Sequence, residues 1–171
     1  MKMSPRIRKF ALTVHVASSV GSLGAVAAFL SLALAGLASG SERVQQGVYV
    51  AMALITWWVI MPSVAVALLT GLIQSLGTRW GLFRHYWVLV KFLLTCLVIV
   101  VLLLQAEAID AIAELSGAAV FSGGELFEIR LSLALHAGGG LLVLLIVEAL
   151  SIYKPPGLTR YGRRMRADMG D

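Results

Sequence analysis

Four long apolar runs constrain this chain more than any other feature of its sequence. They cover about residues 10–37, 48–76, 86–105 and 131–152. A helix needs about 20 mostly apolar residues to cross a hydrocarbon core of ~30 Å, so each run is long enough to span a bilayer. None of the runs alternates between apolar and polar residues, and all are too long for strands of a membrane barrel. The sequence therefore predicts an all-α, integral membrane four-helix bundle that forms a single domain over residues 1–171.

The composition supports a membrane protein over every soluble class. Hydrophobic residues make up 59% of the chain and charged residues 13%, whereas soluble domains carry about 25% charged residues. The formal net charge is +5, but the basic residues cluster at the ends of the apolar runs. We therefore expect the lipid bilayer as the partner and no nucleic acid. A single cysteine, Cys96, cannot form a disulfide within the chain.

The first run also resembles the start of a signal peptide, because basic residues precede it. The apolar part of a signal peptide is typically 7–15 residues long, and this run is nearly twice that length. The small residues Ala33, Ala35 and Ala38 leave a cleavage site open. The length favours a helix that stays in the membrane.

The distribution of Lys and Arg predicts the orientation of the chain. Basic residues precede the first run, lie between the second and third, and follow the fourth, whereas the two remaining loops are mainly acidic. By the positive-inside rule, both termini are cytoplasmic and residues 153–171 form a basic cytoplasmic tail. We expect a multi-pass protein of a bacterial inner membrane. The basic residues on the predicted cytoplasmic side are Lys2, Arg6, Arg8, Lys9, Arg79, Arg84, Lys154, Arg160, Arg163, Arg164 and Arg166.

Four ionisable side chains fall inside the predicted spans, where each costs about 2.5–3.5 kcal/mol on insertion scales. They are His15, Lys91, His136 and Glu148. With a helical rise of ~1.5 Å per residue, all of these except His136 lie roughly 6–8 Å below the cytoplasmic surface. An imidazole, an ammonium and a carboxylate from three helices thus share one layer.

Two interpretations of this layer stay open. In the first, it is an internal salt bridge that fixes the register of the helices. In the second, it is a cofactor site in which His15, Lys91 and Glu148 bind the cofactor and His15 is the metal ligand, as in haem b. His15 and His136 cannot share one iron, because they are separated by roughly 14 Å along the normal of a ~30 Å core and axial nitrogens lie only about 4 Å apart.

Other residues of the spans form faces at helical spacing. His136, Gly139, Gly140 and Val143 share a face of the fourth run, where the glycines would admit a partner backbone or a flat ligand. A similar stripe on the third run holds Lys91, Thr95, Val98, Leu102 and Gln105. The role of His136 itself cannot be predicted from its position.

Three features predict local details of the spans. Pro62 lies near the middle of the second run and predicts a bend there. Trp57-Trp58 lies near mid-bilayer, where packing or lipid contact is favoured over the wall of a pocket. An acidic face at helical spacing, formed by Glu107, Asp110 and Glu114, predicts that the third helix extends beyond the bilayer until Ser122-Gly123-Gly124 ends it.

The order of several short motifs resembles known membrane families. A histidine closes Lys9-Phe10-Ala11-Leu12-Thr13-Val14-His15, Pro62 precedes Leu68-Leu69-Thr70-Gly71-Leu72, and Tyr86-Trp87-Val88-Leu89-Val90-Lys91 opens the third run. This order resembles the HemJ-type protoporphyrinogen oxidases and the CopD-like copper-resistance membrane proteins. In the HemJ-type proteins, the matching His and Lys are linked to haem b binding and activity, so the resemblance implies these roles for His15 and Lys91. The whole chain also resembles small four-helix membrane proteins of bacteria, which implies no activity.

These observations lead to one functional hypothesis and two alternatives. The hypothesis is a membrane protein that binds haem b or a related redox cofactor through the His15–Lys91 layer, with Glu148 as a proton relay or counter-ion. The first alternative is a non-enzymatic structural subunit or binding scaffold of a membrane complex. The second is a transporter of ions or small solutes, which would need to form a homo-oligomer.

Overall fold

The chain folds into a bundle of long helices. A computed structural model describes residues 3–77, 81–115 and 124–168, which are helical except for short connections, and no strand occurs among them. Four helical stretches are long and apolar enough to span a membrane, so the predicted four-helix membrane bundle is confirmed. The elements are α1 (Pro5–Ala38), α2 (Glu42–Ile55), η1 (Thr56–Ile60), α3 (Met61–Gly77), α4 (Tyr86–Leu115), α5 (Gly124–Tyr153) and α6 (Arg160–Asp168).

The second span is built from three consecutive elements. It runs from Glu42 to Gly77 through α2, η1 and α3. The other spans consist of α1, α4 and α5, each several residues longer than the corresponding apolar run. The extra turns contain charged residues, so the helices continue past the ends of the apolar runs.

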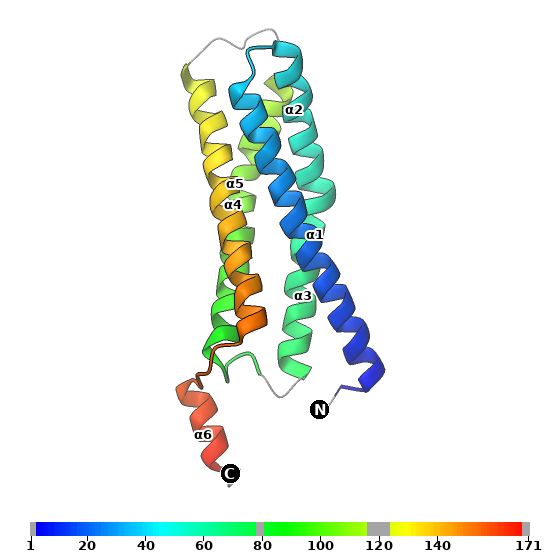
Figure 1. Ribbon diagram of the computed structural model, residues 1–171, viewed down its shortest axis with the longest axis vertical. Helices are drawn as coiled ribbons and strands as arrows, with labels where there is room; N and C mark the ends of the chain where they lie inside the picture. Colours follow the sequence, from blue (N-terminus) through cyan, green and yellow to red (C-terminus); the bar gives the residue numbers. More distant parts are fainter. Residues whose placement is uncertain (1–2, 78–80, 116–123, 169–171) are drawn as a thin grey trace.

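The four spans form a closed square in which each span has two neighbours. The second span and α5 both pack against α1, and both also pack against α4. The helices α1 and α4 occupy opposite corners. Figure 1 shows both ends of the chain at the same end of the bundle, with α6 beyond it. We call this the terminal end, and the opposite end, where α1 connects to α2, the loop end.

The predicted bend at Pro62 takes the form of a π-helical segment. The segment η1 immediately precedes Met61-Pro62, and the Met61 amide donates to the carbonyl of Thr56, five residues earlier. A proline in a regular helix clashes with the carbonyl four residues before it and lacks an amide proton. The wider π turn accommodates one extra residue at this point. The Thr56 hydroxyl, fully buried, donates to the Met52 carbonyl at 2.8 Å.

The outer surface of the spans is apolar, as contact with lipid requires. Trp58 is 78% exposed and Leu104 75% exposed, so mid-bilayer Trp58 faces lipid, as the sequence favoured. The protein core lies between the helices and is densest in the middle and towards the loop end. Its buried members include Val26, Phe29, Ala33, Tyr49, Met52, Ile60, Val64, Ile109, Ile112, Leu133 and Leu144.

The acidic extension of the third span is confirmed, and one of its carboxylates bonds to the second span. The helix α4 continues to Leu115. Glu107 and Glu114 are exposed, but Asp110 accepts a hydrogen bond of 2.9 Å from Nε1 of Trp57. This bond ties the π segment of the second span to α4. Of the predicted break, Ser122 and Gly123 lie outside the described residues, and Gly124 is the first residue of α5.

A close contact between α1 and α2 near the loop end yields a test of the packing. A Cβ atom added at Gly36 would lie 2.8 Å from the Tyr49 hydroxyl oxygen and 2.9 Å from its ring, and Tyr49 is only 1% exposed. Arg130 also makes a cation–π contact with the face of the Tyr49 ring, and its guanidinium carbon lies 5.3 Å from the ring centroid. Tyr49 therefore has little freedom to move away from a side chain at Gly36.

We expect Gly36→Ala to lower the thermal unfolding midpoint of the detergent-purified protein by several degrees, since overpacking costs about 1–3 kcal/mol. The matched control is Gly24→Ala in the same helix, where nothing lies within 4 Å of the new Cβ. That variant should be unchanged or more stable, because Ala favours a helix by up to ~1 kcal/mol over Gly. Equal midpoints for the two variants would contradict the α1–α2 packing described here.

Candidate functional site

His15 is fixed on α1 by the second span. Its Nδ1 lies 3.0 Å from the carbonyl oxygen of Ala67 and 3.1 Å from the hydroxyl oxygen of Thr70, both on α3. A carbonyl oxygen only accepts, so the proton of the neutral ring is on Nδ1. The Thr70 hydroxyl donates to the Val66 carbonyl at 2.6 Å and can therefore accept from His15. The other ring nitrogen, Nε2, is left as an acceptor.

The surroundings of His15 explain why α1 and α3 approach closely. A Cβ atom at Gly71 would lie 3.0 Å from Cε1 of His15, so the glycine makes room for the ring. One turn before His15 in α1, the Ala11 carbonyl accepts a hydrogen bond of 3.3 Å from the Gln74 amide. The α1–α3 contact near the terminal end is therefore fixed by side-chain bonds to backbone carbonyls.

Lys91 is satisfied by the fourth span. Its ammonium group donates to the Ser151 hydroxyl of α5 in a short hydrogen bond, and that hydroxyl donates in turn to the Val147 carbonyl at 2.9 Å. Among the residues that the structure describes, Lys91 forms no ion pair with Glu148. The internal salt bridge considered from the sequence is therefore replaced by a bond from ammonium to hydroxyl.

Glu148 connects the two sides of the predicted layer through its charge. It lies half-buried on α5, which packs against both α1 and α4. Its carboxylate interacts electrostatically with His15 and with Lys91, and Lys91 also interacts with His15. The structure thus brings the three predicted residues within electrostatic range of one another. Their hydrogen bonds differ, however, because His15 bonds to α3 and Lys91 bonds to Ser151 of α5.

A cavity of about 340 Å³ lies further towards the loop end, between α4 and α5. Residues of α1 and η1 complete its wall, and almost all of the lining is aliphatic. The two side chains able to form hydrogen bonds are Gln105 and His136. The lining residues are Val26, Phe29, Ile60, Leu97, Val98, Val101, Leu102, Gln105, Ile109, Leu133, Leu135, His136, Ala137, Gly139, Gly140 and Val143.

His136 makes its hydrogen bonds through Nδ1. That nitrogen lies 2.7 Å from the Ser132 carbonyl oxygen, which only accepts, and 2.6 Å from the Gln105 amide nitrogen, which only donates. The Ser132 hydroxyl oxygen is 3.2 Å away. Nε2 of His136 makes no hydrogen bond with any residue in the described part of the chain. This nitrogen is left for a ligand: it accepts a hydrogen bond when Nδ1 carries the proton, and it donates one when Nδ1 accepts from Gln105.

The sequence contained the signal for this cavity. His136, Gly139, Gly140 and Val143 were predicted to share a face that admits a flat ligand, and all four line the cavity. Val98, Leu102 and Gln105, from the stripe on the third run, line the opposite side. What the sequence could not show is that these two faces meet, because hydropathy does not determine which helices are neighbours.

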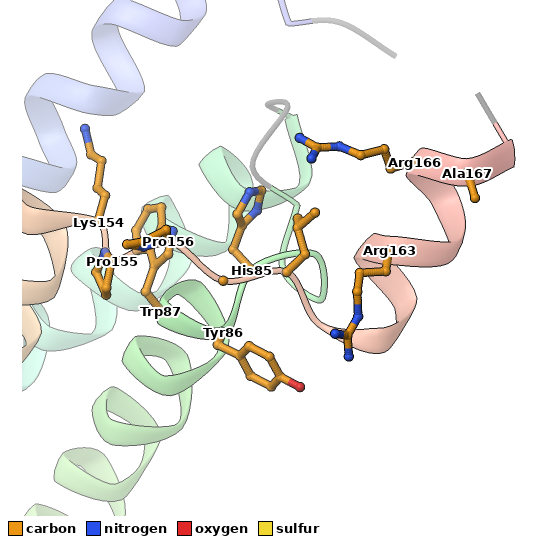
Figure 2. Close-up of a pocket in the computed structure, with 11 residues that line it drawn as sticks. His85, Tyr86, Trp87, Lys154, Pro155, Pro156, Arg163, Arg166 and Ala167 are labelled. Carbon is orange, nitrogen blue, oxygen red and sulfur yellow. The ribbon is translucent and has the colours of Figure 1, made fainter. Parts of the chain in front are cut away.

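A second cavity, of about 880 Å³, lies outside the bundle at the terminal end. It is formed by the start of α4, the connection from α5 to α6, and α6 itself (Figure 2). Neither cavity is lined by His15, Lys91 or Glu148. The residues that line this second cavity are His85, Tyr86, Trp87, Lys154, Pro155, Pro156, Gly157, Leu158, Arg163, Arg166 and Ala167.

The tail is docked on the loop between α3 and α4, which the sequence did not predict. The Thr159 amide donates to the Arg84 carbonyl at 3.0 Å, and the Tyr86 amide donates to the Gly157 carbonyl at 3.3 Å. The Thr159 hydroxyl donates to the Phe83 carbonyl and accepts from the Gly162 amide at 3.0 Å, which caps the N-terminus of α6. The one available signal was this capping threonine two residues after Gly157.

Gly162 and Gly157 form a matched pair for testing the docked tail. A Cβ atom at Gly162 would collide with the backbone carbonyl of Arg84, whereas one at Gly157 would lie 3.6 Å from the Tyr86 ring, an ordinary contact. We expect Gly162→Ala to release the tail, and amide hydrogen exchange at Thr159 and Tyr86 to become at least tenfold faster. Gly157→Ala should keep the wild-type exchange rates. Unchanged exchange in Gly162→Ala would contradict the docking.

No family model, no curated protein and no solved structure matches this chain. The resemblance to the HemJ-type oxidases and CopD-like proteins therefore stays a prediction, as do the roles that it implies for His15 and Lys91. The membrane-spanning bundle, by contrast, follows from the length and composition of its own helices.

Proposed function

We propose that this multi-pass membrane protein binds a flat, mainly apolar molecule that ends in a hydroxyl group, of the quinol class, in the cavity between α4 and α5. The observation that carries the proposal is the ring nitrogen Nε2 of His136, which has no partner in the described part of the chain, in the wall of a mainly apolar cavity. Ligand sites are typically apolar cavities of ~300–1,000 Å³ with a few polar groups that orient the ligand. A volume of about 340 Å³ suits a headgroup of one or two rings.

The lining of the cavity supports entry of the ligand from the bilayer. Leu135 is 66% exposed and Leu97 50% exposed, so two residues of the cavity wall also face the lipid. Gly139 and Gly140 have open space where a Cβ would lie, which leaves room for a ring against the α5 backbone. A lipid-soluble molecule can reach such a site without crossing water.

The unbonded ring nitrogen of His136 supports a ligand with a hydroxyl group. A hydroxyl group can donate a hydrogen bond to Nε2 or accept one from it, so a quinol suits either tautomer of the ring. Such a hydrogen bond contributes about 1 kcal/mol to binding.

The distribution of charge supports a cytoplasmic position for the terminal end of the bundle, in a bacterial inner membrane. Among the residues that the structure describes, the basic residues that flank the spans lie there except Arg43 and Arg130, and an excess of Lys and Arg is typical of cytoplasmic loops. In this orientation, the quinol-class site lies in the half of the bilayer remote from the cytoplasm.

We expect a short-chain quinol to raise the thermal unfolding midpoint of the purified protein, because a ligand that binds only the folded state stabilises it. Gly140→Leu fills the cavity and should abolish this shift. The matched control is Gly138→Leu, which also has open space around its Cβ but does not line the cavity; it should keep the shift. His136→Leu should weaken binding about tenfold.

Retention of the full shift in Gly140→Leu, or its loss in both glycine variants, would contradict binding in this cavity. An equal response of the wild type and His136→Leu to the quinol would show that His136 does not bind its hydroxyl group.

A second candidate function is haem b binding at the layer predicted from the sequence. A metal-binding histidine usually donates its other ring nitrogen to a carbonyl or carboxylate, and Nδ1 of His15 donates to Ala67 in this way. His15 Nε2 would hold the iron, and Lys91 and Glu148 would interact with charged groups of the cofactor. Haem supplies one-electron chemistry when bound. This proposal ranks second because neither cavity is lined by these residues.

The haem proposal predicts a Soret band and an α band in the reduced-minus-oxidised spectrum of the detergent-purified protein. Both bands should disappear in His15→Ala and persist in His136→Ala, which removes the only other histidine of the spans. A wild-type protein that stays colourless after addition of haem would contradict the proposal. With no response to quinol either, the two alternatives from the sequence would remain: a structural subunit or scaffold of a membrane complex, and an oligomeric transporter.

A further inference from the structure

We propose that the cavity between α6 and the start of α4 binds the phosphate group of an anionic phospholipid. This site lies at the terminal end, remote from the cavity proposed for the quinol-class ligand, and the two proposals do not depend on each other.

The charge of the cavity is uniformly basic. Its lining contains His85, Lys154, Arg163 and Arg166, and none of the lining residues is acidic. In the described part of the chain, the guanidinium group of Arg166 forms no hydrogen bond or ion pair. Arginine binds phosphate with two parallel hydrogen bonds, so this group is available for an anion.

Three of the basic side chains point to one side of the tail. In Figure 2, Lys154, His85 and Arg166 all extend to the same side of the connection between α5 and α6, whereas Arg163 extends to the other side, as Tyr86 does. The three come from the end of α5, the start of α4 and α6. A phosphate group on this side would lie among basic side chains from three segments of the chain.

The depth of the cavity favours a lipid over a soluble phosphate compound. Tyr86 and Trp87 line it, and Tyr and Trp are typical of the headgroup layer of a membrane. Directly beside it, Ile152 is 74% exposed and Tyr153 82% exposed at the end of α5. A phospholipid bound here can place its phosphate among the basic groups and its acyl chains along the apolar surfaces of α4 and α5.

The docking of α6 holds Arg166 in place before the lipid binds. Thr159 and Gly162 pack against the backbone of Phe83 and Arg84, and Arg163 and Arg166 follow within the next turn of α6. A site organised in advance loses less conformational freedom when it binds its ligand. This distinguishes the cavity from a mobile basic tail, which attracts any anionic surface.

The test measures thermal unfolding of the detergent-purified protein with added phosphatidylglycerol, phosphatidylcholine or inorganic phosphate. We expect phosphatidylglycerol alone to raise the midpoint by several degrees. Lys154→Gln/Arg166→Gln should lose most of this shift. The matched control is Arg160→Gln/Arg164→Gln, which removes the same charge from residues outside the cavity lining and should keep it. All four side chains are exposed, so both variants should fold.

Native mass spectrometry gives a second readout, the number of phosphatidylglycerol molecules retained. We expect one more on the wild type and the control variant than on the cavity variant. Equal losses in the two double variants would overturn the proposal in favour of diffuse attraction to the basic tail. An equal response to inorganic phosphate would overturn it in favour of a soluble phosphate compound.

Discussion

Inside a bilayer, every backbone amide and carbonyl must find its hydrogen-bond partner within the protein, and the rest of this structure depends on that constraint. It makes all four spans helical. It also explains the π segment, because Pro62 cannot continue a regular helix and the Met61 amide bonds instead to the carbonyl five residues earlier. Polar side chains follow the same constraint: His15 bonds to the Ala67 carbonyl, and Ser22 to the carbonyl of Ser19.

In the square arrangement of the spans, α5 packs against both α1 and α4, as the second span also does. Side chains of α5 can therefore interact with groups on both of these helices, which occupy opposite corners. Near the terminal end, Glu148 of α5 acts electrostatically on both His15 and Lys91. Nearer the loop end, Gly139 and Gly140 leave α5 without side chains where it faces α4, and the cavity forms there.

The sequence predicted the features that depend on one helix at a time. Hydropathy gave the four spans, and the helical period placed His136, Gly139, Gly140 and Val143 on one face. Features that depend on two segments could not be predicted. The pairing of Lys91 with Ser151, of His15 with α3 and of Trp57 with Asp110 requires the order of helices around the bundle. The helix α6 has a basic sequence without an apolar stripe, and its position depends on the backbone of the loop at Arg84.

The central claim is that α4 and α5 enclose a site for a hydroxyl-bearing, lipid-soluble ring. The most direct measurement is photolabelling of the membrane-embedded protein with a diazirine-bearing quinol analogue, followed by mass spectrometric mapping of the adducts. The account predicts adducts within residues 97–109 of α4 and 133–143 of α5, and their suppression by excess unlabelled quinol. Adducts spread evenly over the lipid-facing surfaces of all four spans, unaffected by competitor, would contradict it.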